Sequence, residues 1–216
     1  VEKENGNRTI FITEQMFSKI KKEEVSKEII ASTKILHLDE FQIEASIVAA
    51  SYAKELGVKV VLDLESPNKQ NLLSLIKLSD FLIIPENFAT GFSKKNIEKS
   101  AEFFLSLGPE CIVITQGEKG AFCKTNSKSF HQGIFKVDVV DTTGCGNVFH
   151  GSFIYGLLKG WEIEIIVEFA SAVSALKCKK LGGRAGCPTF DEVKNFLLKN
   201  GSEEIKRTLE NEKKEI

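Results

Sequence analysis

The order of apolar runs along the chain is the feature that most restricts its fold. Short stretches rich in β-branched residues alternate with stretches in which apolar residues recur at intervals of three and four, the spacing of one helix face. Strands that are apolar along most of their length belong in a parallel sheet covered on both faces. The alternation therefore predicts an open α/β fold. The predicted strands are Thr9–Ile12, Ile35–Leu38, Val58–Leu62, Phe81–Ile84 and Cys111–Ile114.

This alternation changes after Ile114. A hairpin is predicted from Gly120 to Ile134, and two long helices are predicted over about residues 144–159 and 162–180. The second of these helices is rich in small and apolar residues, which suits a helix that packs against a sheet.

The C-terminal end has a different composition from the rest of the chain. Nine of the sixteen residues from Gly201 onward are charged, and such a segment is expected to fray. We therefore predict a folded core over residues 1–200 and a charged C-terminal tail over residues 201–216.

The balance of charges narrows the class of partner. Lys and Arg total 29, Asp and Glu total 30, and the isoelectric point is near 6.4. Such a chain has no net positive field with which to bind a nucleic acid backbone. No run reaches the ~18 apolar residues that a membrane span needs. The expected partner is a small molecule, with no nucleic acid and no membrane involved.

The cysteines indicate a compartment. Their number is odd, no pair has the CxxC spacing, and most of them lie inside apolar runs, as buried thiols do in a reducing environment. We therefore predict a cytoplasmic protein. The five are Cys111, Cys123, Cys145, Cys178 and Cys187.

The segment from Val139 to Gly151 carries the strongest chemical signal. Gly144 and Gly146 stand where an apolar helix begins, and glycine lets the backbone turn sharply there and approach a ligand closely. The first turn of a helix offers unpaired N–H donors and a partial positive charge, which together suit a phosphoryl group. From the glycines alone, a helix start that binds nothing is an equally good interpretation.

This segment resembles the C-terminal signature of the PfkB or ribokinase-like carbohydrate kinases, D-T-x-G-A-G-D followed by an aromatic and small residues. Further stretches match the family in order and spacing, and the resemblance runs from about residue 8 to residue 199. The matching stretches are 115–121, which resembles the T-x-G-x-x-G nucleotide loop, 169–172, which resembles the helix beside the adenine, and 181–189, which resembles the closing segment that ends in P-T.

The resemblance implies a ribokinase-like three-layer α/β/α sandwich with a mostly parallel sheet. It also implies transfer of a phosphoryl group from ATP, with Mg²⁺, to a sugar hydroxyl. By position, backbone amides of Gly144, Cys145 and Gly146 would form the anion hole, which is what phosphoryl transfer mainly needs. The residues implied for nucleotide binding are Thr115, Gly117, Gly120 and Ser171.

Two acidic residues are implied as metal ligands. Asp141 matches the family's ligand for a monovalent cation such as K⁺, although a carboxylate here would also compensate the helix dipole. The family's N-x-x-E element for Mg²⁺ falls near Pro85, but neither of its residues is in register. Glu86 is the candidate after a local shift, and Asn87 is equally well explained as an ordinary helix N-cap.

The chain departs from the family at the position of the catalytic base, where the family has Asp and this sequence has Asn147. An amide cannot accept a proton near pH 7, and a positioned base typically contributes about 10²–10⁴-fold. Asn147 is therefore expected to impair turnover and to leave ATP binding intact. A nucleoside kinase of the same superfamily and a catalytically silent nucleotide-binding protein are the alternatives.

The resemblance also implies a fold that is incomplete at the N-terminus. Family members carry about a third more chain before the region matched by Arg8, including the lid sheet and the glycine motif that touches the sugar. An exposed strand edge would then favour association, for example into a homodimer.

Candidates for the substrate side come from the strand ends. Asp39 and Asp63 each follow a predicted strand, and open α/β sheets bind ligands at the carboxyl ends of their strands. They are assigned to a sugar or nucleoside, and strand-end turn carboxylates explain them equally well.

Overall fold

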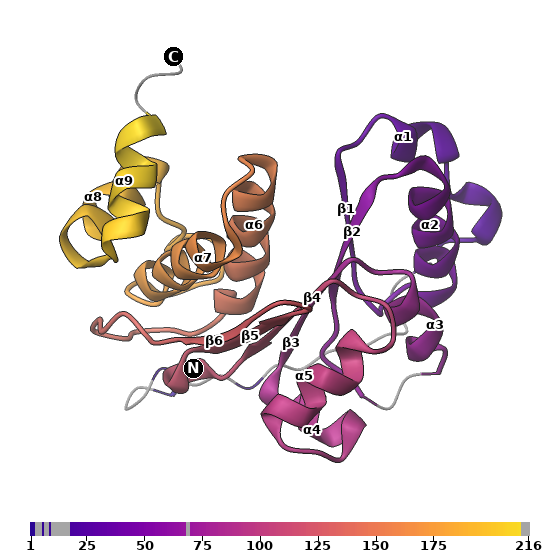
Figure 1. The fold of residues 1–216 in the computed structure, drawn as a ribbon, viewed down its shortest axis with the longest axis horizontal. Helices are drawn as coiled ribbons and strands as arrows, with labels where there is room; N and C mark the ends of the chain where they lie inside the picture. The colour runs from indigo at the N-terminus through magenta and orange to yellow at the C-terminus, as the bar shows by residue number, and fades with distance from the viewer. Residues whose placement is uncertain (3–5, 7–8, 10–17, 68–69, 213–216) are drawn as a thin grey trace. The chain divides into compact units, whose positions relative to one another are not determined.

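The computed structural model describes residues 1–2, 6, 9, 18–67 and 70–212. The predicted strand Thr9–Ile12 lies outside the described residues except for Thr9. The chain divides into two compact units, which are considered separately (Figure 1). We call Thr13–His131 the sheet unit, and Val1–Ile12 together with Gln132–Ile216 the helical unit.

A mixed sheet confirms the predicted α/β class. Its first four strands are parallel and run in sequence order, and the fifth is antiparallel to the fourth and opens the predicted hairpin. Every predicted strand within the described residues is present. The strands are β1 Ile35–Leu38, β2 Lys59–Asp63, β3 Phe81–Pro85, β4 Cys111–Thr115, β5 Ala121–Thr125 and β6 Ser129–Gln132.

The helices of the sheet unit share one hydrophobic core with one face of the sheet. Val60 and Leu82 on that face are fully buried, and so are Val61 and Val113, whose side chains point to the other face. The central strands are therefore buried on both faces, as their apolar sequences predict. The helices are η2 Lys22–Glu24, α1 Lys27–Ala31, α2 Ile43–Leu56, α3 Leu72–Lys77, α4 Glu86–Ser93, α5 Ile97–Leu105 and η3 Gly117–Lys119.

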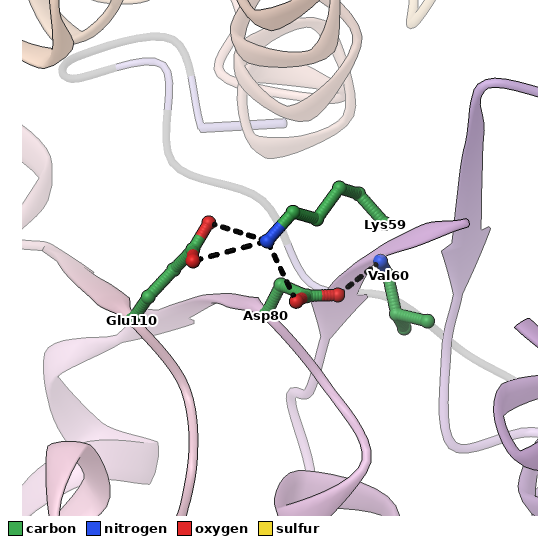
Figure 2. A network of polar contacts seen from close by, with 4 residues as sticks. All are labelled: Lys59, Val60, Asp80 and Glu110. Carbon is green, nitrogen blue, oxygen red and sulfur yellow. Dashed lines mark hydrogen bonds and ion pairs between the residues drawn. The ribbon is translucent and has the colours of Figure 1, made fainter. Parts of the chain in front are cut away.

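A polar network joins the amino-terminal ends of the parallel strands (Figure 2). Asp80 accepts a hydrogen bond from the Val60 N–H at 2.8 Å, and Lys59 Nζ lies 3.0 Å from both Asp80 and Glu110. Burial lowers the pKa of Lys59, but its hydrogen bonds to Asp80 and Glu110 outweigh burial and raise that pKa overall. The network fixes the start of β2 against the turn before β3.

Within its described residues the helical unit contains four helices, and Figure 1 shows α6 beside α7 with α8 and α9 following (orange to yellow). Side chains from α7, α8 and α9 form its core, with Phe169, Leu197 and Leu209 among the buried residues. The predicted pair of long helices is confirmed in α6 and α7. The bounds are α6 Cys145–Leu158, α7 Ile163–Lys177, α8 Phe190–Asn200 and α9 Glu203–Asn211.

Helix α9 contradicts the expectation that the charged tail frays. Ile205 and Leu209 on this helix are fully buried. The helix begins after Ser202, whose N–H and hydroxyl donate to the carboxylate of the buried Glu168 at 2.7 and 2.6 Å. Because the apolar residues recur every four positions, the charges occupy the remaining faces of a packed helix. Among the described residues, no helix is both long and apolar enough to cross a membrane.

Candidate functional site

The segment Asp141–Asn147, called the phosphoryl loop after its predicted role, leads into helix α6. Gly144 is the N-cap of α6 and has a φ of 79°. A Cβ atom placed there would lie 2.9 Å from the carbonyl oxygen of Gly183. The position therefore needs glycine twice over, because the backbone is left-handed and because the chain at Gly183 passes too close for a side chain.

The backbone amides of the loop divide into engaged and available donors. The Cys145 N–H donates to the Thr142 carbonyl at 3.2 Å and so closes the turn. Gly146 and Asn147 are exposed, and no described residue accepts a hydrogen bond from their N–H groups. The predicted anion hole comprised the amides of Gly144, Cys145 and Gly146, and of these the Cys145 N–H is engaged within the turn. Gly146 and Asn147 are the exposed residues of the loop with available N–H groups, and the anion hole itself stays a prediction.

Asp141 is buried and ties two loops together. Its Oδ1 accepts the Thr143 N–H at 2.8 Å, and its Oδ2 accepts the Gly182 N–H at 2.7 Å. Hydrogen bonds from Thr143, joined by that from Gly182, lower the pKa of Asp141 to about 2. Asp141 is therefore ionised at neutral pH, as a cation ligand must be. Its role as a monovalent-cation ligand stays a prediction.

Residues in the last turn of α7 and its C-cap form hydrogen bonds with the backbone of the phosphoryl loop. The Lys177 side chain is fully buried, and its Nζ donates to the Asp141 carbonyl at 2.9 Å. The Ser174 hydroxyl donates to the Cys145 carbonyl at 3.0 Å, and the Cys178 carbonyl accepts the Asp141 N–H at 3.1 Å. These three residues of α7 and its C-cap were not predicted as site residues. The signal in the sequence was the basic run of Lys177, Lys179 and Lys180 at the end of the predicted helix, which is equally typical of an ordinary helix C-terminus.

Ser171 lies one turn earlier on α7. Its hydroxyl donates to the Val167 carbonyl at 2.8 Å, and its side chain is half-buried. Within the described part of the helical unit, no hydrogen bond links the Ser171 side chain to the phosphoryl loop. Its assignment to nucleotide binding stays a prediction.

The candidate site residues of the sheet unit lie at the carboxyl-terminal ends of the parallel strands. Asp39, Asp63, Glu86 and Thr115 stand at or just after the carboxyl ends of β1 to β4, which are parallel. The Asp39 carboxylate accepts the Phe41 N–H at 2.9 Å, which is the turn geometry that the sequence offered as the alternative. The placement suits a ligand edge, and the substrate roles of Asp39 and Asp63 remain untested.

Glu86 contacts the predicted nucleotide loop. Its carboxylate accepts a hydrogen bond from Gln116 Nε2 at 3.3 Å and lies 3.7 Å from Lys119 Nζ. Glu86 is the first residue of α4 and Pro85 is the N-cap. The interpretation of Asn87 as the N-cap was therefore wrong, because the helix begins one residue before it.

The predicted nucleotide loop, residues 115–121, is a compact turn at the end of β4. The Gln116 N–H donates to the Gly120 carbonyl at 2.8 Å. Gly117 and Gly120 have φ angles of 58° and 97°. The residues Thr115, Gly117 and Gly120 are thus held in one turn beside Glu86, and nucleotide contact stays a prediction for each.

Comparison with known proteins identifies the relatives of this arrangement. Residues 1–189 match the pfkB family of carbohydrate kinases. The chain belongs to this family. Ribokinase from Staphylococcus aureus is 32% identical over 161 residues, which cover 71% of this chain and 53% of that protein. Ribokinase from Haemophilus influenzae is 34% identical over 158 residues, which cover 69% and 51%.

Solved structures confirm the ribokinase-like fold. The Thermotoga maritima ribokinase superposes with a TM-score of 0.75 and 29% identity, over 82% of this chain and 61% of that one. The Arabidopsis thaliana ribokinase, solved with ribose and ATP, gives a TM-score of 0.74 and 25% identity, over 79% and 58%. The chain thus spans about half the length of the curated relatives that it matches.

Proposed function

We propose that this chain carries the phosphoryl-transfer part of an ATP-dependent kinase whose acceptor is a sugar hydroxyl. The observation that carries the proposal is the pair of exposed N–H groups of Gly146 and Asn147 at the start of α6, presented by a turn that only glycine fits at Gly144. Donors fixed in this way stabilise charge as it develops on a transferring phosphoryl group. The family and its ribokinase members support the sugar as acceptor.

The proposed cofactors are ATP and Mg²⁺, with K⁺ as a further cation. Glu86 is the described residue that we assign to Mg²⁺, because its carboxylate lies next to the nucleotide loop at Gln116 and Lys119. Oxygen ligands of this kind suit Mg²⁺, which supplies neutralisation of phosphate charge when it is bound. Asp141 fits K⁺ in chemistry, because each of its oxygens accepts one N–H and retains a further lone pair.

Asn147 stands where the family has its base, and the proposed kinase is therefore slow. The side chain is exposed in the first turn of α6, where it can orient a hydroxyl and cannot take its proton. Restoring a carboxylate with Asn147→Asp is expected to raise sugar-dependent ADP release by about 10²–10⁴-fold.

The experiment follows ADP release from ATP, Mg²⁺ and K⁺ with D-ribose as the first acceptor, and measures the heat of ATP binding separately. Asn147→Ala is the matched control, since it removes the amide and adds no base. Equal ADP release from the Asn, Asp and Ala forms would refute the role assigned to Asn147.

Two other functions remain as alternatives. A nucleoside kinase of the same superfamily would release ADP with adenosine or another nucleoside instead of ribose. A silent nucleotide-binding protein is favoured by Asn147 specifically, and it would bind ATP without ADP release for any acceptor, even as the Asn147→Asp variant. ADP release with each acceptor, together with the heat of ATP binding, distinguishes the sugar kinase, the nucleoside kinase and the silent nucleotide-binding protein.

The edge of the sheet is the basis for a proposed homodimer. β1 is the terminal strand of the sheet order and pairs with β2 alone among the described strands. An edge of this kind can pair with another strand. Sedimentation of the purified chain at several concentrations tests the dimer.

The cytoplasmic location predicted from the cysteines also stays a prediction.

A further inference from the structure

Two cysteine sulfurs lie close together where the phosphoryl loop contacts the end of α7. Cys145 is the first residue of α6 and Cys178 is the C-cap of α7, and their Sγ atoms lie 2.8 Å apart. The other adjacent pair, Cys111 and Cys123 in the sheet unit, has its sulfurs 3.7 Å apart.

Backbone contacts hold the closer pair in place. The Cys145 carbonyl accepts from the Ser174 hydroxyl at 3.0 Å, and the Cys178 carbonyl accepts from the N–H groups of Val140 at 2.8 Å and Asp141 at 3.1 Å. Both residues are thus fixed by hydrogen bonds between the loop and the end of α7. The sulfurs stay close without any rearrangement of the chain.

The two pairs differ in exposure. Cys145 and Cys178 are partly exposed, and Cys145 is followed by the exposed Gly146 and Asn147. Cys111 and Cys123 are 3% and 0% exposed. The hydrogen bond with Cys123, together with burial, raises the pKa of Cys111 well above its usual value. Because oxidants react with accessible thiolates, the loop pair is the reactive one and the sheet pair is inert.

We propose that Cys145 and Cys178 form a reversible disulfide that acts as a redox switch on the phosphoryl loop. With a peroxide as oxidant, one sulfur attacks a peroxide oxygen, the O–O bond breaks, and a sulfenic acid and one water form. The second sulfur then displaces the hydroxyl as a second water, and the S–S bond forms. Two thiols and one hydrogen peroxide give one disulfide and two waters. A dithiol reverses the reaction by thiol–disulfide exchange.

The disulfide would pull the loop and the end of α7 together. An S–S bond is about 2.05 Å long, so the two sulfurs must approach each other from the present separation of 2.8 Å. The Gly146 and Asn147 amides follow Cys145 directly in the chain, so a bond at Cys145 constrains their positions. A misplacement of about 1 Å at a reacting centre costs up to about 10²-fold in rate. Under the function proposed above, oxidation is therefore expected to lower ADP release by roughly 10-fold or more.

The experiment treats the folded chain, as Cys187→Ser to remove the exposed thiol, with a small excess of hydrogen peroxide. Remaining thiols are alkylated after unfolding and the peptides are mapped by mass spectrometry. The expected product is a link between the peptides of Cys145 and Cys178, absent after dithiothreitol, with Cys111 and Cys123 fully alkylated. The matched controls are Cys178→Ser, which must abolish the link, and Cys123→Ser, which must leave it unchanged.

Two readouts connect the link to the loop. Hydrogen exchange of the peptide around Gly146 is expected to slow on oxidation and to recover on reduction, whether or not the chain is active. ADP release by the Asn147→Asp variant is expected to fall and recover in parallel if the proposed function holds, and a reduced Asn147→Asp chain without ADP release refutes that function alone. The switch is overturned if the two thiols remain alkylatable at doses that oxidise Cys187 in the unsubstituted chain, or if the link forms and loop exchange is unaltered.

Discussion

Gly144→Ala tests how the phosphoryl loop is built. Alanine at a φ of 79° enters the left-handed region, which costs about 1–2 kcal/mol. Its Cβ would also lie 2.9 Å from the Gly183 oxygen and 3.2 Å from the Gly183 Cα, so the backbone must move. Overpacking of this kind costs about 1–3 kcal/mol. The expected loss of unfolding free energy is therefore about 2–5 kcal/mol.

Two other glycines of the helical unit separate these costs. Gly160 has a φ of 69° and nothing within 4 Å of a built Cβ, so Gly160→Ala is expected to cost only the conformational part, about 1–2 kcal/mol. Gly146 lies in the first turn of α6 with open space around it, and Gly146→Ala is expected to be neutral or to stabilise the fold by up to about 1 kcal/mol.

Urea unfolding followed by far-UV circular dichroism gives the free energies of all three variants. The expected order of stability is Gly146→Ala, then Gly160→Ala, then Gly144→Ala. If Gly144→Ala cost no more than Gly160→Ala, the close approach of Gly183 would not be a constraint on the loop. If neither variant lost stability, the argument from the left-handed backbone would be wrong as well.

Three further predictions test other parts of the structure. The pKa of Asp141 is lowered to about 2 from the usual 3.8, so its stabilising contribution is complete above about pH 4 and is lost as the pH falls through 2. Asp141→Asn should remove that part of the acid dependence of the unfolding free energy, measured from pH 2 to 7. An unchanged pH profile would contradict the assignment. Leu209→Ala should lower the unfolding free energy by about 2–5 kcal/mol because Leu209 is fully buried, whereas Glu210→Ala should change it by less than about 0.5 kcal/mol; equal effects would mean that α9 is not packed. Asp80→Ala should lower the unfolding free energy by about 1–3 kcal/mol because the Val60 N–H loses its acceptor. Lys59→Met removes only a partly exposed ion pair and should lower it by at most about 1 kcal/mol. The reverse order in thermal unfolding would refute the importance of that hydrogen bond.

Sequence patterns predicted the sheet well because the signal is local. Each strand from β1 to β4 is apolar at consecutive positions, and both faces of the central strands are buried. Helix α3 is an exception, because its six residues, Leu72–Lys77, are too few to show a helical period. For α9, the charge content outweighed the apolar residues Ile205 and Leu209, whose spacing of four was present in the sequence.

The candidate site was predictable only where its signal lies within a few residues. The glycines around Cys145 and the helix start at Gly144 are such a signal, and the structure places them at the start of α6. The support from Lys177 was not predictable, because its contact with Asp141 joins residues 36 apart. The same holds for the Asp141 contact with Gly182, which depends on how the chain returns after α7.

The buried ammonium of Lys177 changes what an anion would meet at the loop. Asp141 places a full negative charge beneath the exposed amides, and such a charge by itself would repel a phosphate. Lys177 contributes an opposite charge on the other side of the same residue, 2.9 Å from its carbonyl and sealed from solvent. The two charges compensate, and dissolved salt screens neither of them strongly. The amide dipoles of Gly146 and Asn147 then determine the attraction, and because these amides are exposed, added salt is expected to weaken anion binding here.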